Sequence, residues 1–162
     1  MKQYDIRRAE PADMDEILTI YGKAREFMAR TGNPTQWGNG YPERQLLEDD
    51  MAKNSLYVVT EQGIIRGVFY FVIGNDPTYG YMEQGSWRSN EPYGTIHRIA
   101  GDGSGGIFSA CLDFCSGLIR HIRIDTHHDN KPVQHVVEKH GFSPRGVIYV
   151  ADGSPRIAYD RI

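Results

Sequence analysis

The segment from residue 96 to residue 142 constrains the fold most, because a strand-like run leads through a glycine-rich loop directly into an amphipathic pattern. Residues 96–100 form the strand-like run, and residues 101–108 read GDGSGGIF. Glycines leave few Cβ atoms in the way, so the main-chain N–H groups of such a loop can converge on an anion at the positive end of a helix dipole. The order strand, glycine loop, helix therefore predicts a phosphate-binding site.

The residues after the loop repeat at helical spacing and predict a helix, with Ser104 as its N-cap. A second strand follows at residues 122–126, then a second helix that ends before Gly141. Strand, helix and strand in this order favour two parallel strands side by side, joined by a right-handed crossover. The apolar stripe of the first helix consists of Ile107, Phe108, Cys111, Leu112, Cys115, Leu118 and Ile119.

Two other nucleotide-binding patterns fit less well. A Walker loop needs a lysine and then a serine or threonine, but Gly106 is followed by Ile107 and Phe108. A dinucleotide-binding fold needs an acidic residue about twenty positions on, and Asp125 and Asp129 lie near that distance. However, the loop begins after residue 100, behind a region of mixed rather than strand–helix–strand pattern.

These residues resemble the acetyl-CoA-binding core of the GNAT superfamily of N-acetyltransferases. The family pattern continues after the loop as Asn-x-x-Ala-x-x-x-Tyr-x-x-x-Gly-Phe, and here Asn130, Gly141 and Phe142 stand at matching positions. Val133 and Val137 replace the family's alanine and its tyrosine, which protonates the leaving thiolate in many members. In the loop Gly106 matches the main glycine, whereas Gly103 and Phe108 stand where a basic or amide residue and a small residue are usual.

The resemblance implies a mixed α/β fold, with a central, mostly antiparallel sheet, a parallel strand pair at the CoA site and about four flanking helices. It implies transfer of an acetyl group from acetyl-CoA, the cosubstrate, to a primary amine of a small molecule or peptide. A CoA-binding or ligand-sensing module without transferase activity is the alternative. The residues expected to bind the cosubstrate are Ile99, Ala100, Gly101, Gly103, Ser104, Gly105, Gly106, Ile107, Asn130 and Lys139.

The rest of the chain follows the same element order. Residues 4–28 resemble the family's first strand and helix, with Asp13 expected to cap the helix. Residues 43–53 predict a second helix, and residues 56–60 and 64–73 an antiparallel hairpin. A last hairpin is expected at residues 146–150 and 156–159, which flank an Asp-Gly turn.

His97 is the candidate catalytic base, because it lies on the strand that leads into the glycine loop, where the family places the amine beside the thioester. A half-buried strand histidine satisfied by a neighbour is the alternative. Trp37 and Tyr41 lie in a long glycine-broken loop, and Glu83 and Trp87 in an aromatic and acidic segment at residues 75–93. All four are candidate substrate contacts, the alternatives being core packing for the first pair and a protruding hairpin or homodimer contact for the second.

Composition favours one domain over residues 1–162 and a cytoplasmic protein. A net charge of -3 and a pI near 6.0 argue against a nucleic-acid partner, and no apolar run approaches the length of a membrane span. Cys111 and Cys115 are expected in the core rather than in a disulfide. No metal is expected, since the adjacent His127 and His128 should diverge from a strand end.

Overall fold

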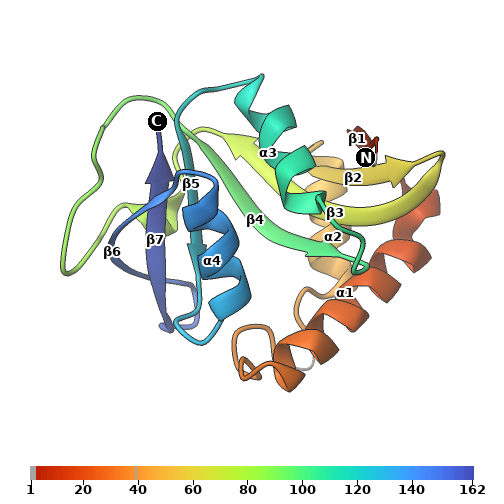
Figure 1. The fold of residues 1–162 in the computed structure, drawn as a ribbon, viewed down its shortest axis with the longest axis horizontal. Coiled ribbons are helices and arrows are strands. Elements are labelled where there is room, and N and C mark those ends of the chain that lie inside the picture. The colour runs from red at the N-terminus through yellow and green to blue at the C-terminus, as the bar shows by residue number, and fades with distance from the viewer. Residues whose placement is uncertain (1–2, 39) are drawn as a thin grey trace.

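The computed structural model describes residues 3–38 and 40–162, and it contains one seven-stranded sheet with helices on both faces (Figure 1). The described elements are β1 (Asp5–Arg8), α1 (Met14–Arg30), α2 (Arg44–Ala52), β2 (Leu56–Glu61), β3 (Ile64–Ile73), β4 (Gly94–Gly101), α3 (Ile107–Ser116), β5 (Ile122–Thr126), α4 (Lys131–Lys139), β6 (Ser143–Tyr149) and β7 (Pro155–Arg161). This architecture confirms the predicted mixed α/β class.

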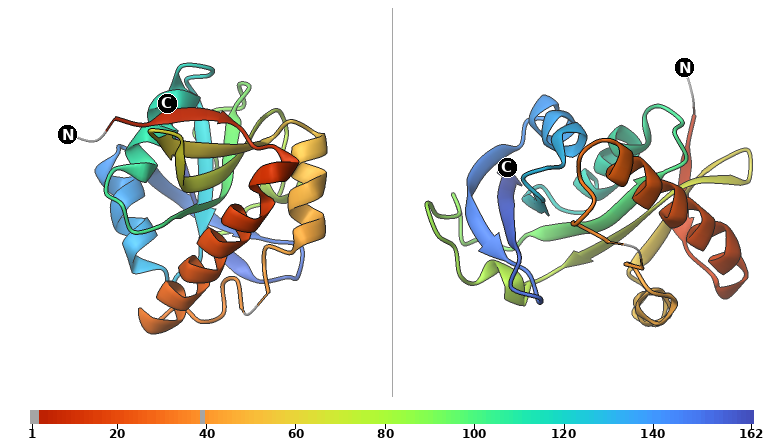
Figure 2. Two further views of the ribbon diagram at one scale, coloured as in Figure 1. Left: turned by 90° about the vertical axis from the view of Figure 1, so that its right-hand side faces the viewer. Right: turned by 90° about the horizontal axis from the view of Figure 1, so that it is seen from below.

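The strands lie in the order β1-β2-β3-β4-β5-β7-β6, and every described pair is antiparallel except the parallel pair β4–β5. Strand β1 and the C-terminal hairpin β6–β7 therefore occupy opposite edges (Figure 2). The parallel pair falls at the predicted place, on either side of the glycine loop and α3.

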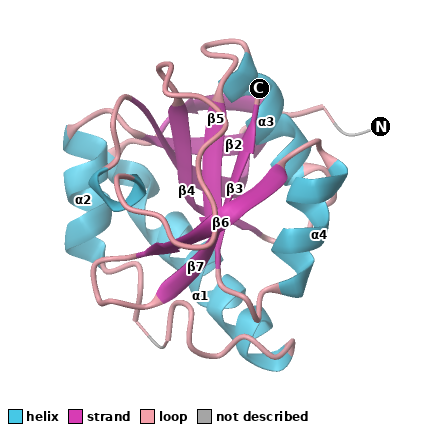
Figure 3. Cartoon of the chain, turned by 90° about the vertical axis from the view of Figure 1, so that its left-hand side faces the viewer, coloured by secondary structure: helices cyan, strands magenta, loops and turns pink. Residues whose placement is uncertain are grey.

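Two apolar layers hold the helices to the sheet, since successive strand residues face opposite sides. On β2, Val58 contacts the layer under α1 and α2, while Val59 contacts the layer under α3 and α4. On β3, Val68 and Phe69 divide in the same way. Figure 3 shows α2 on one side of the sheet and α3 and α4 on the other.

Glycines let the start of α3 approach the sheet closely. A Cβ added to Gly67 would lie 2.7 Å from the Ile107 side chain, so a larger residue there would push α3 away. Gly101, at the end of β4, meets the same side chain at 3.2 Å from its would-be Cβ. The packing of Ile107 fixes where the N-terminus of α3 points.

Of the two predicted N-caps, Ser104 is wrong, and Asp13 is right in position but makes no side-chain cap hydrogen bond. The N-cap of α3 is Gly106 in the left-handed conformation (φ 85°), not Ser104. Ser104 instead uses its main-chain N–H to bond the Asp102 carboxylate at 2.9 Å, inside the loop. Asp13 does precede α1, but its carboxylate accepts from the Glu10 N–H and from Arg7 rather than from an N–H of α1.

Candidate active site

The two parallel strands separate just where the glycine loop follows. Strands β4 and β5 pair only at Gly94–Ile122 and Thr95–Arg123, and the residues beyond these pairs diverge. The edge of β4 from His97 onward therefore loses its neighbour on the β5 side, while β3 still pairs with it on the other. The sheet therefore has an opening between β4 and β5, at which one edge of β4 is unpaired.

A β-bulge in β4 directs the side chains at this opening. The β3–β4 register shifts between Val68 and Tyr70, and Arg98 adopts a positive φ of 51°. The Tyr21 hydroxyl donates to the Arg98 carbonyl at 2.7 Å, so α1 holds the bulge from below. The Arg98 guanidinium donates to the Asp50 carboxylate at 2.8 and 3.1 Å, which ties the bulge to α2 as well. A non-glycine residue in this conformation needs such support.

His97 lies between two carboxylates that come from different parts of the chain. Its Nε2 is 2.7 Å from an oxygen of Asp76, which follows β3, and its Nδ1 is 3.5 Å from Oδ1 of Asp125 on β5. Burial alone would raise the pKa of Asp76, but the His97 contact and two donors from Thr78 outweigh it and lower the pKa to about 2. The Tyr79 hydroxyl donates to Asp125 at 2.7 Å, and burial keeps the pKa of Tyr79 well above its ordinary value.

These contacts assign the proton positions on His97. An ionised Asp76 can only accept, so the 2.7 Å contact requires His97 Nε2 to carry a hydrogen. In neutral His97 the lone pair is then on Nδ1, and 3.5 Å is too long for a hydrogen bond to Asp125. A proton that arrives at Nδ1 would face the Asp125 carboxylate.

A cavity of about 680 Å³ opens in front of His97 and falls in the range of small-molecule sites. Its walls come from the α1–α2 connection, β4, β5, the start of α4 and the turn between β6 and β7. The predicted site residues that line it are Trp37, Tyr41, His97, Ile99 and Asn130.

Glu83 and Trp87 do not line this cavity. Trp87 packs against Tyr79 with ring centroids 5.1 Å apart, and its indole N–H donates to the Tyr79 carbonyl. The Glu83 carboxylate accepts from the hydroxyls of Tyr81 and Tyr149 on the exterior. Segment 75–93 is not a protruding hairpin but folds back on β6, where Glu83 bridges Val147.

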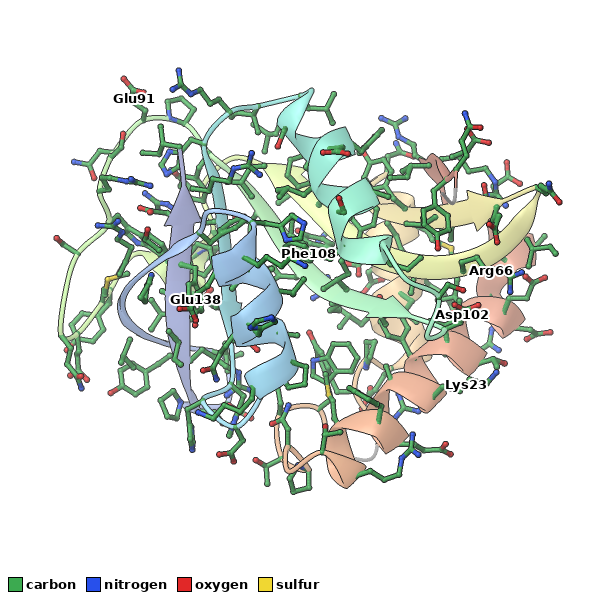
Figure 4. The ribbon with its side chains drawn as sticks, viewed as in Figure 1. Lys23, Arg66, Glu91, Asp102, Phe108 and Glu138 are labelled. Atoms are coloured by element: carbon green, nitrogen blue, oxygen red, sulfur yellow. The ribbon has the colours of Figure 1, made fainter. Side chains whose placement is uncertain are left out.

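The glycine loop presents main-chain N–H groups at the N-terminus of α3. The first helical bond runs from the Ala110 N–H to the Gly106 carbonyl at 3.0 Å, so the N–H groups of Ile107 and the next two residues have no acceptor within the helix. The Tyr4 hydroxyl donates to the Gly105 carbonyl at 2.7 Å and holds the loop. The Asp102 carboxylate, in the loop, forms an ion pair with the Arg66 guanidinium of β3 (Figure 4).

The other predicted cosubstrate residues differ in their surroundings. Ala100 is buried under the α1 layer, and Gly103 adopts a positive φ of 95° in the loop. Asn130 is the N-cap of α4 and donates through its amide to Gln36 Oε1 at 3.0 Å, so it also fixes the α1–α2 connection. Lys139 ends α4 with an exposed side chain.

His127, His128 and Asp129 do gather three candidate ligand atoms within 4.8 Å of one another. However, His127 Nδ1 accepts from the Asp129 N–H at 3.0 Å, and its Nε2 lies 3.3 Å from the Thr35 hydroxyl. Both ring nitrogens of His127 are thus engaged. The side chains do not diverge as expected, since the two imidazole rings stack at 4.3 Å.

Sequence reasoning missed Asp76 and Arg156, and it considered Asp125 only as a ribose ligand. Asp76 carries a local signal, because an Asp before Pro-Thr is typical of a short cap, and it does accept from the Thr78 N–H. Its second oxygen meets a histidine 21 residues away, for which the sequence gives no sign. Arg156 has no sequence signal beyond its place near the last turn.

The comparisons agree with this geometry. A GNAT-family acetyltransferase from Streptococcus agalactiae has 31% sequence identity with the chain and a TM-score of 0.83, covering 100% of this chain and 97% of the other. Ard1 from Thermoplasma volcanium has 22% identity and a TM-score of 0.67 (98% and 97% covered), and a GNAT-family acetyltransferase from Listeria monocytogenes has 16% and 0.70 (98% and 94%). These last two show the fold alone.

No family model matches the sequence, and no curated protein matches it either. The separated parallel strands and the glycine loop at the start of α3, together with these structures, define the class as an acetyltransferase fold. The chain belongs to the GNAT family of acetyltransferases, as its sequence predicted. The part of the chain that the structure describes contains no helix with the length and apolarity that crossing a membrane requires.

Proposed function

We propose that the protein transfers an acetyl group from acetyl-CoA to a primary amine of a small molecule or peptide. The observation that carries the proposal is His97 at the wall of the cavity, with one nitrogen held by Asp76 and the other free to accept a proton. The family supports acetyl transfer in general, and the cavity supports an acceptor of small-molecule size or the end of a peptide.

Bound acetyl-CoA would supply a thioester carbonyl carbon as the electrophile. The free edge of β4 after Thr95 offers main-chain groups to the amide-bearing arm of CoA, and the free N–H groups at the start of α3 offer donors to its pyrophosphate. The Asp102 carboxylate accepts from the Ser104 N–H and not from the N–H groups at the start of α3, so those groups stay open to a ligand. The chain thus offers main-chain groups to the amide-bearing arm and to the pyrophosphate of the cosubstrate.

His97 would remove the proton that blocks the acceptor. A protonated amine has no lone pair, and a lysine-type amine has a pKa of about 10.4 in water. An ammonium beside Asp125 would give its proton to His97 Nδ1, and the nitrogen lone pair would then attack the thioester carbon. The C–N bond forms, the C–S bond breaks, the attacking nitrogen releases its second proton to solvent, and the thiolate leaves and takes a proton from solvent. Asp76 orients the ring throughout.

The test is turnover of acetyl-CoA with a panel of primary amines and peptides. Thiol release that depends on the amine, together with detection of the acetylated amine by mass spectrometry, would support the proposal. Binding of acetyl-CoA without thiol release for every amine would instead favour the CoA-binding or ligand-sensing module. Trp37 and Tyr41 remain proposed acceptor contacts, while Glu83 and Trp87, which lie off the cavity, would contact only a long acceptor.

A further inference from the structure

Arg156 is a buried cation that forms no salt bridge in the described part of the chain. Its residue exposure is 6%, and two of its donors reach only main-chain carbonyls, those of Pro155 at 3.0 Å and Gln36 at 3.3 Å. Within residues 3–38 and 40–162, no carboxylate oxygen lies within 4.0 Å of its guanidinium. Carbonyl dipoles hold the group in place but do not cancel its charge.

Two other arginines with little exposed side-chain surface have closer partners for their guanidinium groups. Arg98 is paired with Asp50 at 2.8 Å. Arg123 lies between the rings of Trp87 and Tyr93, with its guanidinium carbon 4.0 and 3.8 Å from their centroids. An isolated buried charge is costly unless something pairs with it. Arg156 is therefore the exception among these arginines. It also lines the cavity on the side formed by β6 and β7.

Arg156 and Asp125, the carboxylate that faces the proposed proton acceptor His97, share one face of the sheet. Asp125 of β5 lies directly opposite Ala158 of β7, and directly opposed residues point to the same face. Arg156 is two residues before Ala158 and so points to that face as well. Diagonal neighbours of this kind have Cα atoms about 7–8 Å apart. The Arg156 guanidinium thus enters the same cavity as Asp125 and His97.

The charges in the cavity are arranged for a zwitterion. Asp76, Asp125 and His97 form a wall that suits an ammonium, and Arg156 forms a wall that suits an anion. The anion should carry a single charge, since Arg156 is one cation and Asp152 also lines the cavity beside it. A carboxylate matches the planar fork of a guanidinium and meets this limit, whereas a phosphate dianion would be repelled by Asp125 and Asp152.

We propose that the acceptor is an amino acid or a similar amine that bears a carboxylate, and that Arg156 binds this carboxylate while the amine lies at Asp125 and His97. The proposal rests on the proposed acetyl transfer and narrows its substrate class. Burial lowers the pKa of Arg156 from its ordinary value, and the charges of Asp125 and Asp152, which act in the opposite direction, do not offset it. A bound carboxylate would remove that penalty and orient the amine toward His97.

The experiment compares matched pairs of amines that differ by one carboxylate. The pairs are phenylalanine and phenethylamine, tyrosine and tyramine, tryptophan and tryptamine, histidine and histamine, and lysine and cadaverine. For a pair whose side chain the cavity accepts, we expect kcat/KM to be about 10–100-fold higher for the amino acid, because a charged hydrogen-bonded pair is lost in the amine. In Arg156→Met this ratio should fall to about 1, and Arg156→Lys should keep part of it.

Two controls keep the test decisive. Arg120→Met removes an exposed arginine outside the cavity and should keep the wild-type ratio. Melting curves with the N-acetylated amino acids give a readout without turnover: we expect them to stabilise the wild type and not Arg156→Met. If amines are acetylated with ratios near 1 in both proteins, acetyl transfer stands and the carboxylate proposal is wrong. If no amine releases thiol, acetyl transfer fails, and the binding readout alone decides the role of Arg156.

Discussion

At the scale of single residues, the chemistry of His97 is set by groups from three elements. Asp76 after β3 fixes which ring nitrogen carries the hydrogen, and Asp125 on β5 faces the nitrogen that would accept a proton. Tyr79 donates to Asp125 and holds its carboxylate in place. The imidazole is thereby oriented before any ligand arrives, which is what a general base requires.

Replacing His97 by alanine tests this role. We expect kcat/KM for the best amine to fall by about 10²–10⁴, with acetyl-CoA affinity nearly unchanged, because only the proton acceptor is lost. Melting temperature measured on the same variant separates chemistry from folding. His135→Ala, which removes an exposed histidine of α4, is the matched control and should leave kcat/KM at the wild-type value. A fall of less than about tenfold in His97→Ala would assign His97 to structure.

The low pKa of Asp76 predicts an acid-sensitive contribution to stability. A carboxylate whose pKa is lowered in the folded state, here to about 2, stabilises the fold above its unfolded pKa of about 3.9. This contribution, roughly 2 kcal/mol, should disappear as the pH falls from about 4 to 2. Urea unfolding over this pH range should show a shallower loss in Asp76→Asn than in the wild type. The exposed Asp113→Asn should follow the wild-type curve, and identical curves for all three proteins would contradict the prediction.

At the scale of elements, the start of α3 combines close packing against the sheet with free main-chain N–H groups, the proposed donors to an anion. Ile107 is packed against the sheet because Gly67 and Gly101 lack Cβ atoms, while the N–H groups of the first turn stay free. Gly106 joins loop and helix with a φ of 85° that favours glycine. These glycines therefore set the position and orientation of the N-terminus of α3.

Gly106→Glu should abolish acetyl-CoA binding. The substitution strains the backbone and places a negative side chain beside the proposed pyrophosphate donors. Gly106→Asn is the matched control, because asparagine tolerates the left-handed conformation and adds no charge. We expect the control to retain a weakened melting shift with acetyl-CoA and Gly106→Glu to show none. An unchanged shift in Gly106→Glu would place the pyrophosphate elsewhere.

The sequence predicted the β2–β3 hairpin and the start of α3 well, but α3 ends at Ser116, so Leu118 and Ile119 lie beyond the helix whose stripe they were expected to continue. The sequence could not place contacts that depend on folding distant segments together. The β-branched and aromatic residues of segment 64–73 predict β3, but nothing in that segment indicates that Asp76 will contact His97. The position of Trp87 was hidden for the same reason: the sequence does not show that its segment folds onto Tyr79, outside the cavity.

Val137 shows how burial changes an expectation from sequence. A tyrosine at this family position could protonate the thiolate, but Val137 has 0% exposure and packs in the layer that includes Phe142 and Ile124. Val137→Tyr should therefore overpack α4 and lower the free energy of unfolding by about 1–3 kcal/mol, with no gain in kcat. Val137→Ile adds one methylene and should cost less in urea unfolding. A stable Val137→Tyr variant with raised kcat would show that the thiolate does lack an acid.

At the scale of the whole molecule, the sheet consists of two parts joined by a short parallel contact. Strands β1 to β4 pair continuously, β5 to β7 form the second part, and only two residue pairs join β4 to β5. Beyond those pairs the cavity takes the place of the ladder. A ligand that lies along the free edge of β4 would bridge the two parts and stabilise the whole fold.

Acetyl-CoA should therefore raise the melting temperature and protect β4. At one hundred times the dissociation constant, a ligand of the folded state adds about 2.7 kcal/mol, or about 5–10 °C for a chain of this size. NAD and ATP should do much less, because they lack the amide-bearing arm that would pair with the strand edge. Hydrogen exchange should slow in residues 97–101 with acetyl-CoA, whereas the β6–β7 hairpin, which already has its ladder partners, should change little. A shift with NAD but not with acetyl-CoA, or protection confined to β6 and β7, would contradict binding along β4. Protection of both the strand edge and the first turn of α3 would support the proposal, because one ligand would then contact the edge of β4 through its arm and the start of α3 through its pyrophosphate.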